Sequence, residues 1–368
     1  MVSNIPGLKT RCVRIVVGAV LLVSAGASRA GVGVGLSEIA AAAEDGPVTV
    51  YYPAEAAEQP LKRGLVTLSV AAQAAPRRGN GRLVVISHGT GGSPWVHADL
   101  ARALVEAGYV VAVPEHQADN YKDHSDAAGA LSRRPAEVSR AIDAVGRDAR
   151  FATLLDLSQV GVYGMSAGGH TALTIAGGRW SPAGFKRHCE QNLASDFQFC
   201  VGVITQLTGG WLDGLKKWVA LTVIRHRFGD NTVREYHDPR VAAVVAAVPA
   251  AAIFEMASFA APRVPLGLVT AQQDKWLVPR FHSDRVLRVC QPCEHIVDVS
   301  DGGHGAYLSP LPPGLAGLLG DMLNDPPGFD RSAMRAVDRK IAAYFGQHLL
   351  QPSTRRDHGA EIKPPPAP

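Results

Sequence analysis

A serine between two glycines, a later aspartate and a histidine after it have the types and the order needed for nucleophilic catalysis. The serine is Ser166, in Gly164-x-Ser166-x-Gly168. A serine hydroxyl is a weak nucleophile, so it needs a histidine to take its proton and a carboxylate to orient that histidine. In one class of hydrolytic enzymes these groups follow one another as serine, acid, histidine. The pattern therefore predicts acyl transfer at Ser166.

His304 is the candidate base. It lies in the Gly-rich segment 301–305, directly after a short apolar strand pattern at 296–299. His295 begins that strand pattern, which would place it at the wrong edge of a sheet. His348 stands near the end of the last predicted helix. We therefore expect His304 to be the residue that meets Ser166.

Asp274 is the candidate acid. It follows a predicted strand, 265–270, through three residues, which places it at the same sheet edge as Ser166. Glu255, just past the preceding strand, is the second choice.

An oxyanion that forms at the serine needs two fixed hydrogen-bond donors. The first expected donor is the backbone N–H of Ala167, the residue after the serine. The second is the N–H of Thr90, in the loop His88-Gly89-Thr90-Gly91-Gly92 that follows a predicted strand. No Lys-Ser/Thr pair follows this loop, which argues against a phosphate-binding loop.

The elements that must position these residues alternate between strands and helices. Apolar runs predict strands at 48–52, 65–71, 83–87, 109–113, 160–163, 241–248, 265–270 and 296–299. Helical spacing predicts helices at 100–107, at 138–145 with Pro135 as its opening residue, after Ser166, and at 334–345. We expect the first two strands to be antiparallel. The alternation otherwise predicts an α/β fold, a mainly parallel sheet with helices on both faces.

Residues 179–240 interrupt this alternation, and we interpret them as an insertion or cap over the carboxyl edge of the sheet. Apolar residues in this region share one helical face, namely Trp211, Leu212, Leu215, Trp218 and Val219. Two interpretations stay open: a lid at 206–226 that lines the acyl group of a substrate, or an ordinary core helix.

The amino terminus has the pattern of a signal peptide, residues 1–30. Basic residues precede an apolar run at 15–27, and small residues stand at Ser28 and Ala30. The run is shorter than the roughly 20 residues of a membrane-spanning helix, so we expect cleavage and no stable membrane anchor. We expect a flexible leader at 31–45, one domain at 46–351 and a disordered tail at 352–368.

Composition excludes some classes of protein. Of 368 residues, 46% are hydrophobic, which argues against disorder throughout. The net charge of +4 comes from the four basic residues of 1–30, and 33 basic and 33 acidic residues remain without them. A neutral body argues against nucleic acid as a partner. We expect no metal and no cofactor.

Four cysteines follow the predicted signal: Cys189, Cys200, Cys290 and Cys293. An even number in an exported chain favours disulfides, with three possible connectivities. The nearest-neighbour solution pairs Cys189 with Cys200 and Cys290 with Cys293. A redox role for the Cys-x-x-Cys pair lacks the surrounding thioredoxin-type pattern.

From about residue 47 to 345, the chain resembles serine hydrolases of the α/β-hydrolase superfamily. The resemblance rests on Ser-His-Gly-x-Gly-Gly at 87–92, Gly-x-Ser-x-Gly-Gly-His at 164–170 and Gly-Gly-His-Gly at 302–305. It is closest to bacterial predicted dienelactone hydrolases, which are similar to platelet-activating-factor acetylhydrolases. This likeness implies a carboxylic-ester hydrolase with Ser166, Asp274 and His304 as its triad. Dienelactone hydrolase itself uses a cysteine nucleophile where this chain has Ser166.

The leading hypothesis is a bacterial serine esterase, periplasmic or secreted, that cleaves a small-molecule ester through an acyl-enzyme. One alternative is a serine peptidase or amidase on the same triad. The other is a non-catalytic binding protein on a hydrolase scaffold.

Overall fold

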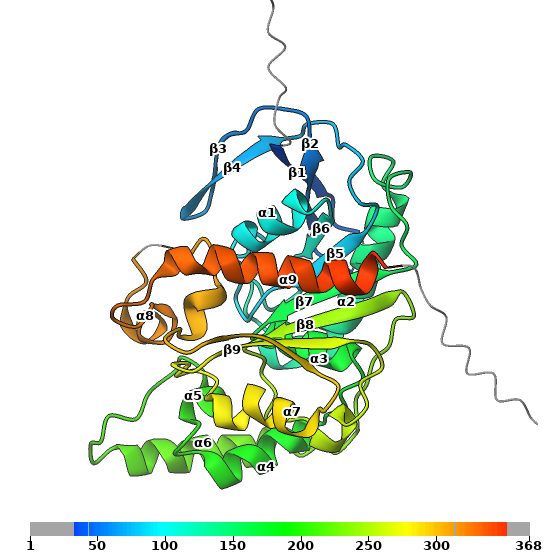
Figure 1. Cartoon of the computed structure of the whole chain (residues 1–368). Coiled ribbons are helices and arrows are strands. Elements are labelled where there is room, and N and C mark those ends of the chain that lie inside the picture. The colour runs from blue at the N-terminus through cyan, green and yellow to red at the C-terminus, as the bar shows by residue number, and fades with distance from the viewer. Residues whose placement is uncertain (1–32, 43, 313, 352–368) are drawn as a thin grey trace, which may run out of the picture.

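The computed structural model describes residues 33–42, 44–312 and 314–351, and in them ten strands form one sheet with helices on both faces (Figure 1). The strand order is β10-β9-β8-β7-β5-β6-β2-β1-β4-β3. All neighbours from β10 to β6 run parallel, whereas β2 pairs antiparallel with β6. The predicted α/β class is confirmed, and the sheet is mainly parallel.

The strands are β1 (Gly33–Ile39), β2 (Val48–Ala54), β3 (Gln59–Arg63), β4 (Val66–Ala72), β5 (Leu83–Ser87), β6 (Val110–Pro114), β7 (Val160–Met165), β8 (Val241–Ala247), β9 (Leu266–Ala271) and β10 (Glu294–Val299). The helices are α1 (Ala98–Glu106), α2 (Ala127–Arg147), α3 (Ala167–Ile175), α4 (Pro182–Asn192), α5 (Phe197–Val201), α6 (Asp213–Arg227), α7 (Ser283–Val289), α8 (Gly317–Leu323) and α9 (Met334–Leu349).

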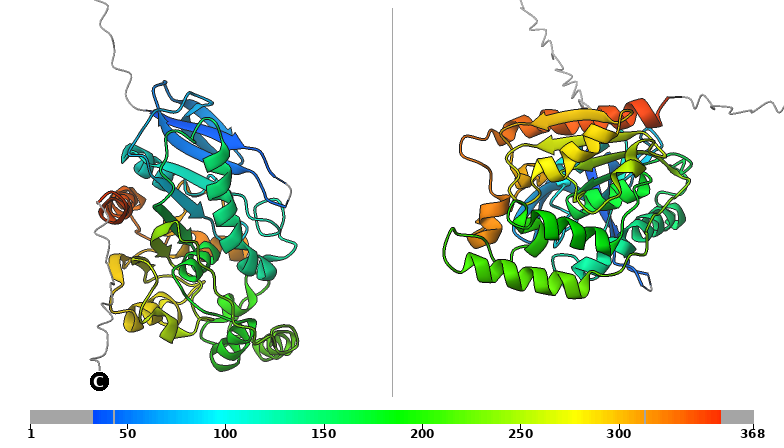
Figure 2. Two further views of the ribbon diagram at one scale, coloured as in Figure 1. Left: turned by 90° about the vertical axis from the view of Figure 1, so that its right-hand side faces the viewer. Right: turned by 90° about the horizontal axis from the view of Figure 1, so that it is seen from below.

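Two hydrophobic cores, one on each face, enclose the central strands. In β7, Val162 packs into the core shared with α2, α3 and α7, and Tyr163 packs into the core shared with α1 and α9. Figure 2 shows these two helical layers from the side. Strands buried on both faces need continuous apolar runs, which is why the runs in β5, β7 and β8 could be recognised as strands.

The predicted flexible leader, residues 31–45, is wrong where the structure describes it. Gly33–Ile39 is strand β1, antiparallel to β2 and parallel to β4. It lies between the two strands that we expected to find side by side, and these run in opposite directions without pairing. The apolar side chains of Val34 and Leu36 are buried, and this burial stabilises a Gly-rich segment as a strand.

Helix α2 begins eight residues before the predicted opening at Pro135. Asp126 caps it by accepting the N–H of Gly129 at 3.0 Å. Pro135 lies inside the helix, where its missing N–H removes one helical hydrogen bond. Aspartate is a preferred cap residue, and this cap sets the start of the helix.

The insertion, residues 179–240, contains α4, α5 and α6. A disulfide between Cys189 and Cys200 joins α4 to α5, and these cysteines form a small separate core with Leu193, Phe197 and Ile224. The second disulfide joins Cys290 to Cys293. The structure therefore has the nearest-neighbour pairing.

The apolar face of the insertion (Trp211, Leu212, Leu215, Trp218 and Val219) points outward. Trp211 is 90% exposed and Trp218 is 65% exposed, and Ile224 is the buried residue of α6. The core-helix interpretation is therefore wrong. Figure 2 shows α6 at the periphery of the molecule.

The predicted signal peptide, 1–30, and the predicted tail, 352–368, lie outside the described residues. No helix in the described ranges is both long enough and apolar enough to cross a bilayer.

A buried histidine next to the Ser166 turn gives the fold a pH dependence. His170 in α3 packs against Trp180 and Phe254, with ring centroids 4.6 and 4.8 Å away. Neither ring nitrogen has a hydrogen-bond partner among the described residues. Burial, and to a smaller extent the charge of Arg134, lowers the pKa of His170 to about 3.

We expect His170→Phe to reduce the loss of stability in acid. Between pH 6.5 and 3 the unfolded chain binds a proton at this site that the folded chain does not bind. Folded wild type therefore loses about 1.4 kcal/mol per pH unit as the pH falls through this window. Thermal melts at pH 7 and 4.5 should show a smaller drop in Tm for His170→Phe than for wild type or for the exposed-site control His237→Phe. Equal drops in all three proteins would contradict this assignment.

Candidate active site

Ser166 occupies the sharp turn between β7 and α3. Its backbone has φ 60° and ψ −117°, a left-handed conformation that is rare for a residue with a side chain. The turn is held from β8 and the residues after it: Ser166 N–H donates to the Ala247 carbonyl at 3.0 Å, and the Ser166 carbonyl accepts the Ala250 N–H at 3.1 Å. This strain fixes the side chain at the carboxyl end of the sheet.

Two glycines allow this turn. A Cβ on Gly164 would overlap the Gly168 carbonyl group, and a Cβ on Gly168 would overlap the Ser87 carbonyl group at the end of β5. The spacing Gly-x-Ser-x-Gly therefore reflects two backbone contacts that leave no room for a methyl group.

The side chains of Ser166, His304 and Asp274 form one chain of hydrogen bonds. Ser166 Oγ lies 3.0 Å from His304 Nε2, and His304 Nδ1 lies 2.7 Å from Asp274 Oδ2. Asp274 Oδ1 accepts the N–H groups of Trp276 and Leu277, each at 2.8 Å. Asp274 Oδ2 accepts the Nδ1–H of His304, and in this tautomer Nε2 can accept the serine proton.

The three residues come from loops after three different parallel strands. Asp274 follows β9, and His304 begins a 3₁₀ turn (His304–Tyr307) after β10. Both side chains are almost completely buried. The structure thus brings together the three residues that the sequence predicts as neighbours.

The other candidates lie elsewhere. Glu255 forms an ion pair with Arg179 at 3.0 Å on the surface. His295 contacts Thr270 Oγ1 at 2.9 Å, and His348 lies 3.9 Å from Glu294.

The loop after β5 lies directly beside the serine. A Cβ built on Gly89 would lie 3.3 Å from Ser166 Cβ. Thr90 N–H has no hydrogen-bond acceptor among the described residues, and Ala167 N–H opens α3 without an acceptor inside the helix. Both expected donors are therefore free to bind a substrate oxygen.

His88 is a structural residue of this loop, as the sequence indicates. It is fully buried, and its Nδ1–H donates to the Gly89 carbonyl at 2.8 Å. Burial and the neighbouring His116 lower the pKa of His88 well below its usual value, so the ring is neutral at pH 7.

Sequence reasoning missed Trp276, whose ring lies 5.4 Å from that of His304, centroid to centroid. Its position two residues after Asp274 was the only available signal. The Trp276 ring packs beside His304, and its backbone N–H donates to Asp274 Oδ1.

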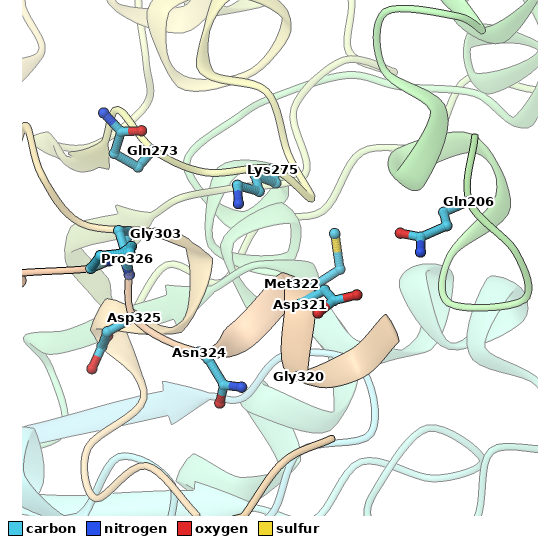
Figure 3. Close-up of a pocket in the computed structure, with 11 residues that line it drawn as sticks. Gln206, Gln273, Lys275, Gly303, Gly320, Asp321, Met322, Asn324, Asp325 and Pro326 are labelled. Carbon is cyan, nitrogen blue, oxygen red and sulfur yellow. The ribbon is translucent and has the colours of Figure 1, made fainter. Parts of the chain in front are cut away.

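A polar cavity of about 420 Å³ adjoins the loops that hold His304 and Asp274 (Figure 3). Its wall includes Gln273, Lys275 and Gly303 from these loops, Asp321 from α8 and Gln206 from the insertion. The insertion therefore contributes to the surface beside the site. Within the described ranges, no group of three or more histidine, cysteine or acidic side chains is placed to hold a metal ion.

We expect Gly168→Ala to be strongly destabilising, because its methyl group would overlap backbone atoms that cannot move without disrupting β5. Gly214→Ala is the control, since a Cβ there meets no atom within 4 Å and the helical position favours alanine by about 1 kcal/mol. Chemical denaturation of both variants measures the difference. Equal stabilities would show that the Ser166 turn tolerates a larger residue.

The comparisons with known proteins bear on the fold. No protein-family model and no curated protein matches the chain. Among solved structures, it is similar to the ferulic acid esterase from Streptomyces cinnamoneus, with a TM-score of 0.55 and 18% identity, over 92% of this chain and 96% of that chain. Likeness at this identity identifies the fold, and the chain has an α/β-hydrolase fold.

Proposed function

We propose that the protein is a serine hydrolase of carboxylic esters, with Ser166 as nucleophile, His304 as base and Asp274 as the acid that orients the base. The observation that carries the proposal is the hydrogen-bond chain from Ser166 Oγ through His304 to Asp274, with distances of 3.0 and 2.7 Å. The left-handed turn at Ser166 and the two free N–H groups of Thr90 and Ala167 support it.

The reaction follows from these contacts. Ser166 Oγ attacks the ester carbonyl as its proton moves to His304 Nε2, and Asp274 stabilises the resulting imidazolium. The N–H groups of Thr90 and Ala167 bind the negative carbonyl oxygen. His304 then protonates the leaving alcohol, and a water molecule, activated by the same histidine, hydrolyses the acyl-enzyme.

Two resemblances to known proteins suggest two different classes of ester substrate. The structural neighbour is a ferulic acid esterase, which supports aromatic acyl esters. The motifs at 87–92, 164–170 and 302–305 resemble those of predicted dienelactone hydrolases and platelet-activating-factor acetylhydrolases, which supports short acyl groups; Ser166, in place of the cysteine of dienelactone hydrolase, argues against a lactone. A panel of acetyl, butyryl, octanoyl and feruloyl esters with a lactone distinguishes these classes.

We also propose export to the periplasm or beyond. Two disulfides in the described part of the chain favour an oxidising compartment. The predicted signal peptide at 1–30 supports the same location. Analysis of the amino terminus of the mature protein tests this, and cleavage after Ala30 is the expected result.

We expect Ser166→Ala to fold normally and to lose about 10⁴-fold or more in ester turnover. A fluorophosphonate probe should label wild type and the exposed-site control Ser125→Ala, and leave Ser166→Ala unlabelled. A p-nitroanilide of the preferred acyl group tests the peptidase or amidase alternative. Full turnover by Ser166→Ala would refute the proposal, and faster anilide than ester cleavage would favour the alternative.

Trp218→Ala tests whether the exposed apolar face acts as a lid over the substrate. Each methylene that loses burial costs about 0.8 kcal/mol, so KM should rise about four-fold per methylene for long acyl chains and change little for acetate. The exposure of Trp218 predicts a small change in Tm. Leu65→Ala, at a side chain 69% exposed between β3 and β4, is the control. An unchanged acyl-chain profile would rule out the lid.

A further inference from the structure

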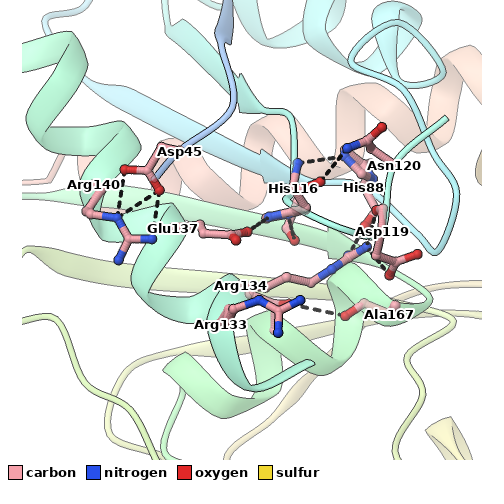
Figure 4. Close-up of polar contacts among 12 residues, drawn as sticks. Asp45, His88, His116, Asp119, Asn120, Arg133, Arg134, Glu137, Arg140 and Ala167 are labelled. Carbon is pink, nitrogen blue, oxygen red and sulfur yellow. Dashed lines mark hydrogen bonds and ion pairs between the residues drawn. The ribbon is translucent and has the colours of Figure 1, made fainter. Parts of the chain in front are cut away.

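A buried ion pair joins α2 to the loop that follows β6, and its arginine also contacts the loop that follows β5 (Figure 4). Arg134 on α2 and Asp119 are fully buried, and Arg134 Nη2 lies 2.6 Å from Asp119 Oδ2. The same guanidinium donates to the carbonyl oxygens of His88 and Gly89. It also donates to the Asp119 carbonyl at 3.1 Å.

The pair controls the backbone on both sides of Thr90. Arg134 holds the carbonyl groups before it, and Asp119 Oδ1 accepts the N–H of Gly91 after it, at 3.0 Å. The Gly89 carbonyl is the most constrained group, since it accepts from His88 Nδ1 at 2.8 Å, from Gly92 N–H at 3.1 Å and from Arg134 Nη2 at 3.3 Å.

The geometry of the peptide bond relates the contact at the Gly89 carbonyl to the direction of the Thr90 N–H. In a planar trans peptide, the carbonyl oxygen of one residue and the N–H of the next point in opposite directions. The Gly89 carbonyl points into the interior toward Arg134, so the Thr90 N–H points away from it. Gly89 itself lies against Ser166. An arginine in the core is thus one of the groups that hold the peptide bond carrying this N–H.

We propose that Arg134, held by Asp119, is a positioning residue that aims the Thr90 N–H at the oxyanion of the reacting ester. This inference rests on the proposed esterase function.

Stability alone does not require an ion pair here. Replacing both members of a buried pair by uncharged groups often leaves a protein as stable or more stable, whereas removing one member leaves an unpaired charge. Uncharged groups do not, however, reproduce the planar guanidinium of Arg134, which binds several carbonyl oxygens in fixed directions.

The test is the double variant Arg134→Met/Asp119→Asn, which removes both charges together. We expect it to fold, to keep KM within about two-fold and to lose about 10²-fold in kcat, as for a lost or misplaced oxyanion donor. The matched control is Arg133→Met/Asp126→Asn. This pair lies at the start of the same helix, 2.7 Å apart and exposed, and asparagine can replace the aspartate cap. The control should keep wild-type kcat.

A thionoester substrate separates positioning from general damage. Its sulfur accepts hydrogen bonds poorly, so an enzyme with an intact oxyanion site prefers the oxygen ester. In Arg134→Met/Asp119→Asn the ratio of oxygen-ester to thionoester turnover should fall at least about ten-fold. Arg134→Lys, which keeps the charge beside Asp119 but loses the planar guanidinium, should lower the ratio in the same direction.

The outcomes are distinct. A wild-type ratio in either folded variant, or the same fall in the control, overturns the positioning role. If the double variant does not fold, the thionoester ratio of Arg134→Lys, measured below the melting temperature of that variant, tests the positioning role instead. Arg134→Lys is expected to fold because it keeps a positive charge beside Asp119. Full activity of Ser166→Ala would instead overturn the esterase proposal itself.

Discussion

The close approach of α3 to the ends of β5 and β7 is the constraint on which the rest of the site depends. Gly168 touches the Ser87 carbonyl group, and this contact leaves Ser166 in a left-handed conformation that costs about 1–3 kcal/mol. The same contact brings the loop after β5 against the serine. The turn at Ser166 and its closeness to the loop after β5 therefore both depend on the absence of side chains at Gly164 and Gly168.

Much of the site could be predicted because its signals are local. The strand–turn–helix pattern around Ser166 and the positions of Asp274 and His304 just after strands place all three at one sheet edge. Arg134 could not be predicted in the same way. An arginine is expected at the surface, and this one precedes the proline that we expected to open the helix. Its burial depends on partners distant in the chain, Asp119 fifteen residues earlier and the carbonyl groups of His88 and Gly89.

The fold was predictable where burial on both faces imposes continuous apolar runs, and less so at its margins. Strand β1 is rich in glycine, which gives it no apolar run to recognise. Its partners β2 and β4 lie at different distances along the chain, so their pairing is not apparent from the sequence. The face on α6 has the right period, but a period does not tell whether a face points inward or outward. The insertion has its own small core around Cys189 and Cys200, and α6 packs against it through Ile224 together with the partly buried Ala220 and Leu221.

The hydrogen-bond chain of the site joins residues that lie 138 and 30 positions apart in the chain. Such contacts form late, because each must offset the entropy of closing a long loop. No local segment contains more than one of the three side chains. A fragment that ends before β9 contains Ser166 but neither Asp274 nor His304, so chain synthesis must pass residue 304 before the hydrogen-bond chain can form. The proposed site is therefore incomplete in the nascent protein until the sheet is nearly complete.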